Sequence, residues 1–529
     1  MKIIKSLSKN NLEKINFKYN KEKMIPFLTT VIISMVVHFS LYALMIIGPD
    51  TLINSMYHQP DVWESMLLRF GLDFVQGVKG YIVSPILVTL ISSIFLGITV
   101  VLVIDILKIS NRYFKYMIAM AFAVAPNISA TLTLFYCSDA YILGMLLATL
   151  AVYIIRRNEN KNWVILISAL LIALSMGMYQ TYLSVTMVLC IATLIIDALS
   201  KKEKREIFAK ILKYIAMGIL GVILFYAISH IVLLIRNLPV SNYSGADSIS
   251  LETLLNLPQL LPQAYISFFD YYFTDNMLPN TIWNTNIFYI IIFGVILVSV
   301  VYCIIKNKVY ENKINTILIL IFIIIAPVCF GIIEIMVPDV DIHILMACSM
   351  VYIFPIFLKI LEMLPKTTIS KISKYVVTIC TLIIIWNYIW QDNASYIVMK
   401  SMQNQTEATL SRIITQIEQL EEYTQDMPIL FLGGLENNTY LSRKNTSIEA
   451  KKLLDRTWGF VANKSTIWWG NLDSWRKMLY EYEGVNLNLV SEWEKAELLQ
   501  TEEFKNMKYY PEKDSIKIID GTVVVRLSD

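Results

Sequence analysis

Long apolar stretches recur along this chain from Ile25 to Trp390, and they limit what it can fold into more than any other feature. A stretch of about 18 or more apolar residues can cross the roughly 30 Å hydrocarbon core of a bilayer as a helix. With 56% hydrophobic and only 16% charged residues, the chain is far too apolar for an ordinary soluble globular protein. The sequence therefore predicts a polytopic α-helical membrane protein.

About eleven stretches have the composition of membrane-spanning helices, and their boundaries are defined to within several residues. The predicted spans are 25–48, 82–107, 116–136, 139–155, 164–178, 182–196, 211–235, 287–305, 314–337, 344–361 and 375–390.

The connections between these spans alternate between basic and nearly uncharged, which predicts the orientation of the chain. Positively charged flanks are retained on the cytoplasmic side of a membrane. One set of connections, together with the N-terminal tail, holds about 26 lysines and arginines, whereas the other set holds only about three, Arg69, Lys79 and Arg236. An eleven-span count with the N-terminus inside places every basic connection in the cytoplasm and the C-terminal part outside.

Three regions follow from this pattern. Residues 1–24 form a cytoplasmic N-terminal tail, 25–391 a transmembrane domain, and 392–529 an extracytoplasmic soluble α/β domain. Two outer loops, 49–81 and 236–286, are long enough to carry chemistry, and the second contains an aromatic-rich segment that predicts a helix in the membrane interface. Strands are predicted at 428–432, 486–490, 515–519 and 523–527, the last two joined by an Asp-Gly turn.

Two carboxylates stand at the outer ends of predicted spans, where a charge costs free energy unless it is solvated, paired or used. Asp50 directly follows the first span, and Asp139 opens the fourth. These positions predict catalytic carboxylates. The simpler alternative is that each marks the water boundary or caps a helix N-terminus, where aspartate stabilises unpaired amides.

Arg69 is unexpected in an outward loop, because positive charge is otherwise kept on the inner side. A guanidinium suits the bidentate binding of a phosphate, so Arg69, with Lys79, is a candidate for anion binding. Glu64 and Asp73 lie near Arg69 in sequence and are candidates for binding a sugar or acceptor; the alternative is an ion pair with Arg69. Lys79 alternatively extends its charged end to lipid headgroups.

Other familiar sites receive no support from the sequence. Tyr179 and Gln180 occupy a very short outer turn, where tyrosine is ordinary. The four histidines are not grouped and the six cysteines have no paired spacing, so neither a metal site nor a disulfide framework is predicted. No nucleotide-binding glycine loop is present, and the net charge of +3 does not indicate a nucleic-acid partner.

Several short motifs recur near the ends of the predicted spans and at the end of the chain. They are Gly48-Pro49-Asp50, Leu68-Arg69-Phe70, Lys79-Gly80 with Pro85, Cys137-Ser138-Asp139-Ala140-Tyr141, Tyr179-Gln180-Thr181-Tyr182 and the closing Tyr510-Pro511 with 516–526. Together they resemble the motifs of the bacterial type II glucosyltransferase family (Gtr type II), membrane enzymes of the GT-C superfamily that modify O-antigens and Gram-positive wall polymers. Leu68 and Phe70 stand where that family has glycine and tryptophan.

The resemblance implies a GT-C-like glycosyltransferase in the bacterial cytoplasmic membrane. Its donor would be a sugar, glucose by default, on undecaprenyl phosphate, and its acceptor a cell-surface polysaccharide or teichoic acid. Asp50 would act as general base in an inverting displacement and Arg69 would stabilise the departing phosphate. Asp139, Tyr179 and Gln180 would hold sugar hydroxyls or orient Asp50. No cofactor, nucleotide sugar or divalent metal is required, although the sequence leaves a metal open, and a donor synthase and flippase would act upstream.

Two alternatives remain open. A transporter or flippase of lipid-linked saccharides would place its polar groups near the middle of the membrane rather than at outer helix ends. A wall-polymer polymerase or assembly scaffold would use the outer domain for recognition, and no single carboxylate would be essential.

Overall fold

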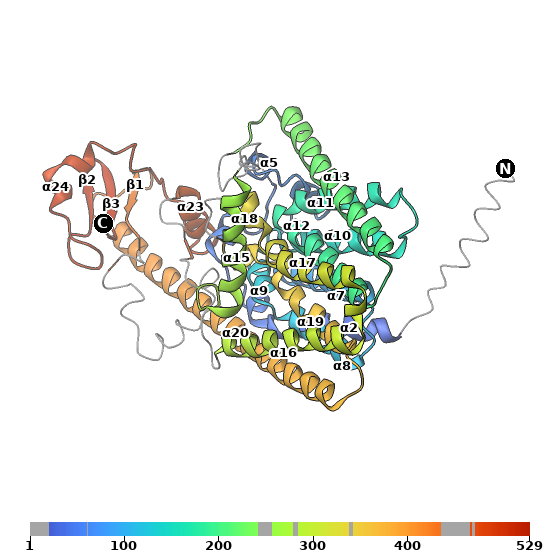
Figure 1. The fold of residues 1–529 in the computed structure, drawn as a ribbon. Helices are drawn as coiled ribbons and strands as arrows, with labels where there is room; N and C mark the ends of the chain where they lie inside the picture. Colours follow the sequence, from blue (N-terminus) through green and yellow to red (C-terminus); the bar gives the residue numbers. More distant parts are fainter. Residues whose placement is uncertain are drawn as a thin grey trace.

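The computed structural model describes residues 21–60, 62–241, 256–278, 284–337, 342–434, 438, 466–467 and 471–528. It consists of a large helical bundle, from which one long helix leads to a small α/β unit (Figure 1). Among these residues, seven helices are long and apolar enough to cross a membrane. The first 20 residues of the expected cytoplasmic tail lie outside the described residues.

Six helices coincide closely with predicted spans, because each is an uninterrupted apolar stretch. These are α7 (Pro85–Leu107), α10 (Ser138–Arg157), α11 (Val164–Met178), α12 (Leu183–Leu199), α13 (Lys204–Arg236) and α16 (Thr285–Lys306).

Four other predicted spans are interrupted by breaks that were not predicted from the sequence. Pro126 starts a new helix because proline lacks the N–H that would continue the preceding one. Gly331 ends a helix where α15 (Leu257–Phe273) approaches closely: an added Cβ would lie 2.5 Å from the Ala264 carbonyl oxygen. The segments are α2 (Lys21–Val37) with α3 (Phe39–Ala43); α8 (Arg112–Ala123) with α9 (Pro126–Leu132); α17 (Lys313–Phe330) with α18 (Ile332–Met336); and the 3₁₀ turns η4 (Ile344–Met346) and η5 (Met350–Tyr352) with α19 (Ile353–Glu362).

The eleventh span belongs to α20 (Thr368–Glu418), which continues through the domain boundary predicted after residue 391 (Figure 1). Gln391 and Asp392 are buried, and residues as far as Met399 belong to the core of the bundle. Leu410 and the following apolar residues of the same helix pack in a second core, that of the C-terminal unit. The two units therefore share one continuous helix.

The first outer loop folds into three short helices, which hold it close to the end of the bundle. The His58 N–H donates to the Tyr81 carbonyl and the Val83 N–H to the Met56 carbonyl, both at 2.9 Å, so the two ends of the loop are tied together. The helices are α4 (Pro49–Ile53), α5 (Val62–Met66) and α6 (Gly71–Val78), and the short turn η1 (Gln180–Tyr182) lies between α11 and α12.

The aromatic-rich segment of the second loop forms the predicted helix, α15 (Leu257–Phe273). Its Tyr272 hydroxyl donates to the Met350 carbonyl at 2.7 Å, and the ring lies 5.2 Å from that of Phe293. The aromatic face of α15 thus packs into the bundle. Residues 242–255 and 279–283 of this loop lie outside the described residues.

The C-terminal unit contains a three-stranded sheet in the order β1-β3-β2, with β1 parallel and β2 antiparallel to β3. Asp520 and Gly521 both have positive φ, 46° and 68°, which confirms the predicted tight hairpin turn. The strand predicted at 486–490 is wrong, because only a single bridge between Leu489 and Ile429 forms there. The elements are β1 (Ile429–Leu432), α23 (Leu472–Glu481), η7 (Leu498–Gln500), α24 (Glu502–Lys505), β2 (Ile516–Ile519) and β3 (Thr522–Arg526), and a further 3₁₀ turn in the bundle is η3 (Val309–Glu311).

Candidate functional site

The motifs that contain Arg69, Lys79, Asp139 and Tyr179 meet at the end of the bundle where α10 begins, and Arg69 is central among them. Its Nη1 lies 3.1 Å from the Tyr141 hydroxyl, and its guanidinium lies 4.8 Å from the centre of the Tyr179 ring. Those two tyrosine rings stack, with centroids 5.0 Å apart and planes 12° apart. The Arg69 Nε is buried and makes no hydrogen bond among the described residues. The cation is thus held by neutral side chains.

The loop that carries Arg69 is fixed by its neighbours. Gln180 donates through Nε2 to the Leu67 carbonyl at 2.7 Å. Leu68 has a φ of 59°, a left-handed conformation that glycine adopts without strain. Gly177 leaves room for the Phe70 ring, because an added Cβ would lie 2.3 Å from its Cζ. Gln180 therefore positions the arginine loop.

Asp50 lies in the first turn of α4, where Pro49 opens the helix after Gly48. The Thr51 hydroxyl donates to the Thr133 carbonyl at 2.6 Å, which ties α4 to the segment before α10. Tyr136, in that segment, is within electrostatic reach of both Asp50 and Arg69. The predicted base and the predicted phosphate ligand therefore both lie in the neighbourhood of Tyr136.

Asp139 and Lys79 form an ion pair with each other. The Lys79 Nζ lies 2.7 and 2.9 Å from the two carboxylate oxygens of Asp139, whose side chain is only 2% exposed. Asp139 also accepts from the Ala140 N–H at 3.0 Å in the first turn of α10. The pair joins the end of α6 to the start of α10, and it neutralises the charge of Lys79.

The other two predicted carboxylates have partners different from Arg69. Glu64 lies 3.2 Å from the His58 Nε2, and both side chains are largely buried. The His58 ring packs edge-on against Tyr136, with centroids 4.9 Å apart, so the pair of Glu64 and His58 lies beside this tyrosine. Asp73 forms an ion pair with Arg236 at the end of α13 and is about one-third exposed. The structure thus keeps Asp73 apart from the Arg69 cluster.

Three members of this cluster, His58, Tyr136 and Tyr141, were not predicted as site residues. Gln76 adds a fourth, since its Nε2 donates to the Tyr136 carbonyl. Tyrosines are common at membrane interfaces, so Tyr136 and Tyr141 did not stand out from the sequence. Among the described residues no group of three metal-ligating side chains occurs.

The C-terminal unit reaches this end of the bundle. Ile47 and Leu52, on either side of Asp50, belong to the C-terminal hydrophobic core together with Trp475. The Ser55 hydroxyl donates to a carboxylate oxygen of Glu481 on α23. The segment that carries Asp50 is therefore packed between the bundle and the C-terminal unit.

Fold and site together define a multi-helix membrane protein with carboxylates gathered at one end of its bundle beside Arg69, which forms no ion pair among the described residues. The profile of the glucosyl transferase GtrII family matches residues 49–354, more than half of the chain and all of the Arg69 cluster. The chain belongs to this family, and its activity class is accordingly glucosyl transfer. No characterised protein and no solved structure matches the chain significantly.

Proposed function

We propose that this protein transfers glucose from a polyprenyl-phosphate donor, undecaprenyl phosphate in bacteria, to a polysaccharide or teichoic acid acceptor at the outer face of the cytoplasmic membrane. The observation that carries the proposal is the environment of Arg69, a cation held by Tyr141 and Tyr179 within reach of the residues around Asp50. Arg69 forms no ion pair in the part of the chain that the structure describes, and a phosphate would supply its counter-charge.

The donor phosphate is bound by Arg69 rather than by Lys79, because Lys79 is already neutralised by Asp139. When the bond between the anomeric carbon and the phosphate oxygen breaks, the phosphate leaves with the electron pair and its negative charge grows. A guanidinium that is already in place stabilises this charge without reorganising, so its interaction is stronger in the transition state than in the ground state.

Asp50 accepts the proton of the acceptor hydroxyl as the new bond to the anomeric carbon forms. Its place in the first turn of a short helix, anchored through Thr51, holds the carboxylate on a fixed element. A single displacement from the face opposite the phosphate inverts the anomeric centre.

Asp139 and Gln180 act as positioning residues. Asp139 acts through Lys79, and Gln180 acts through the Arg69 loop.

The acceptor approaches from the side of the C-terminal unit. This unit packs directly against the segment that bears Asp50, so a polymer bound to it lies next to the base. The predicted cytoplasmic position of the basic connections puts both the unit and the site outside. Glu64 with His58 lines this side of Tyr136 and is a candidate for sugar hydroxyls. A donor synthase and flippase would act upstream.

The test compares donors in membranes that contain the wild-type protein. We expect radiolabelled glucose to pass to wall polymer from polyprenyl-phosphate glucose and not from UDP-glucose added after donor synthesis is blocked. Membranes without the protein are the control. Equal transfer from UDP-glucose would contradict the proposed donor, and vesicle uptake of lipid-linked sugar without transfer would favour a transporter.

A further inference from the structure

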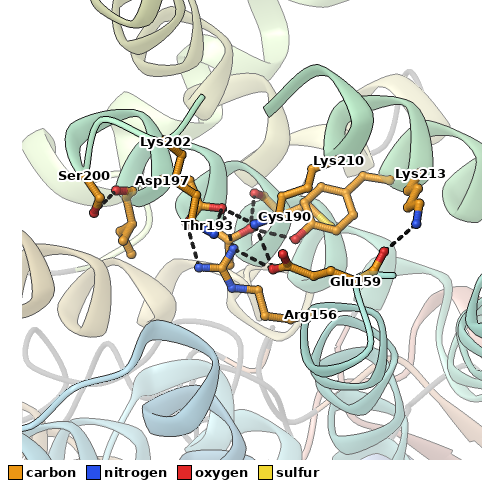
Figure 2. A network of polar contacts seen from close by, with 11 residues as sticks. Arg156, Glu159, Cys190, Thr193, Asp197, Ser200, Lys202, Lys210 and Lys213 are labelled. Atoms are coloured by element: carbon orange, nitrogen blue, oxygen red, sulfur yellow. Dashed lines mark hydrogen bonds and ion pairs between the residues drawn. The ribbon is translucent and has the colours of Figure 1, made fainter. Parts of the chain in front are cut away.

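At the opposite end of α10 from Asp139, a second ionic cluster joins three helices (Figure 2). Arg156 contacts Asp197 through two hydrogen bonds of 2.6 and 2.8 Å. Lys210 lies 2.5 Å from Asp197 and 2.7 Å from Glu159, and Lys202 lies 3.4 Å from Asp197.

The cluster carries more positive than negative charge. Lys213 completes it by donating to the Glu159 backbone carbonyl at 2.5 Å, which is a neutral acceptor (Figure 2). The cluster therefore contains four cationic side chains but only two carboxylates, those of Asp197 and Glu159. Excess charge that is partly removed from water costs free energy unless a counter-ion accompanies it. The cluster is thus electrostatically suited to one additional anion.

An apolar groove of about 470 Å³ begins next to this cluster and runs between α12 and α13. On α12 it extends from Leu194, one turn before Asp197, to Leu183, a length of about 16 Å at the rise of an α-helix. On α13 it starts at Ile211, beside Lys210, and Cys329 of α17 also lines it. Ile219, which lines the groove, is 58% exposed, so the groove is open on the side surface of the helical bundle.

We propose that this groove and cluster form a binding site for an anionic glycerophospholipid, with one acyl chain between α12 and α13 and the headgroup phosphate on Lys202, Lys210 and Lys213. The hydrocarbon core of a bilayer is roughly 30 Å thick, and the groove is about half as long. Its length therefore matches the depth of one leaflet. That length suits an acyl chain and is far too short for a polyprenyl chain. Basic pockets between membrane helices bind phosphate headgroups in the same way.

Glycine at two positions allows a matched test of the groove. A Cβ added at Gly218, which lines the groove, or at Gly294, which lies on α16 outside it, meets no atom within 4 Å. A tryptophan is therefore accommodated at either position without a clash at its Cβ, but only the one at 218 fills the groove.

The experiment is native mass spectrometry of the delipidated full-length chain, titrated with phosphatidylglycerol or with phosphatidylcholine of the same acyl chains. We expect one phosphatidylglycerol to bind with an affinity at least about tenfold higher than phosphatidylcholine. Gly218→Trp should abolish this binding, while Gly294→Trp should retain it. Lys202→Gln combined with Lys213→Gln should weaken it about tenfold, and this variant tests the headgroup even if Gly218→Trp fails to fold.

Three results would overturn the proposal. The first is equal affinity for the two phospholipids, and the second is equal binding by the two tryptophan variants. The third is tighter binding of undecaprenyl phosphate, lost in the same variants, which would assign the groove to a polyprenyl lipid instead.

Discussion

The two ends of the bundle each hold a buried or half-buried arginine, and the two arginines are used differently. Arg156 is neutralised by the bidentate carboxylate of Asp197, whereas Arg69 rests on Tyr141 and Tyr179. A carboxylate cancels the charge of a guanidinium, but a neutral hydroxyl or ring only orients it. The comparison indicates that the Arg156 end holds helices together and that the Arg69 end keeps a positive charge available for a ligand.

The largest expected effect on stability comes from removing the carboxylate of Asp197. Asp197→Asn leaves Arg156, Lys202 and Lys210 close together with one remaining carboxylate, so we expect the free energy of unfolding to fall by about 3–5 kcal/mol. The measurement is thermal unfolding in detergent. Asp73→Asn is the control, because its pair with Arg236 is one-third exposed and contributes at most about 1 kcal/mol. Equal Tm shifts for the two variants would contradict a structural role specific to Asp197.

The second effect concerns the arginine at the other end. Arg69→Gln should lower the rate of glucose transfer by about 10²–10³-fold, or about 2.7–4 kcal/mol, since it removes a preorganised charge from the leaving phosphate. Its Tm should change little, because the guanidinium contacts neutral groups. The measurement is transfer per amount of folded protein, with Arg69→Lys as an intermediate. Full activity of Arg69→Gln would contradict the proposal that Arg69 stabilises the leaving phosphate.

A smaller effect tests whether Lys79 and Asp139 act as one unit. Single variants Lys79→Met and Asp139→Asn should each lower the Tm, and the double variant should lower it by less than their sum. The expected coupling is about 1.5–3 kcal/mol, as for a hydrogen bond between charged groups. Additive changes would show that the pair does not stabilise the junction of α6 and α10.

The smallest effect concerns the backbone beside Arg69. Leu67 and Leu68 are both buried, but only Leu68 has a positive φ. Leu68→Gly relieves left-handed strain while it loses apolar contacts, whereas Leu67→Gly only loses them. We expect Leu68→Gly to be less destabilising than Leu67→Gly by about 1 kcal/mol. The reverse order in thermal unfolding would show that the loop carries no such strain.

Much of this architecture could be predicted from local features of the sequence. Continuous apolar stretches predicted the long helices, and the Asp-Gly dipeptide predicted the hairpin turn. Helix breaks such as the one before α3 depend on distant partners: His38 bonds with Tyr396 and with the Ala123 carbonyl, which lie far away in sequence. The number of membrane crossings and their orientation stay predictions.

The candidate site was predictable where charge is unusual and was missed where residues are ordinary. Asp50, Arg69, Lys79 and Asp139 stood out because charged groups at helix ends need a reason. The pairing of Asp73 with Arg236 depends on how a loop folds onto a helix 163 residues further along, and no local pattern encodes it.

The role of Asp50 is tested by measuring glucose transfer from polyprenyl-phosphate glucose by the wild-type protein and by Asp50→Asn, normalised to folded protein. We predict a loss of about 10²–10⁴-fold, the contribution of a general base. Asp73→Asn, a change of another carboxylate in the same loop, should retain activity because Arg236 binds that side chain. Transfer by Asp50→Asn at the wild-type rate would contradict the account.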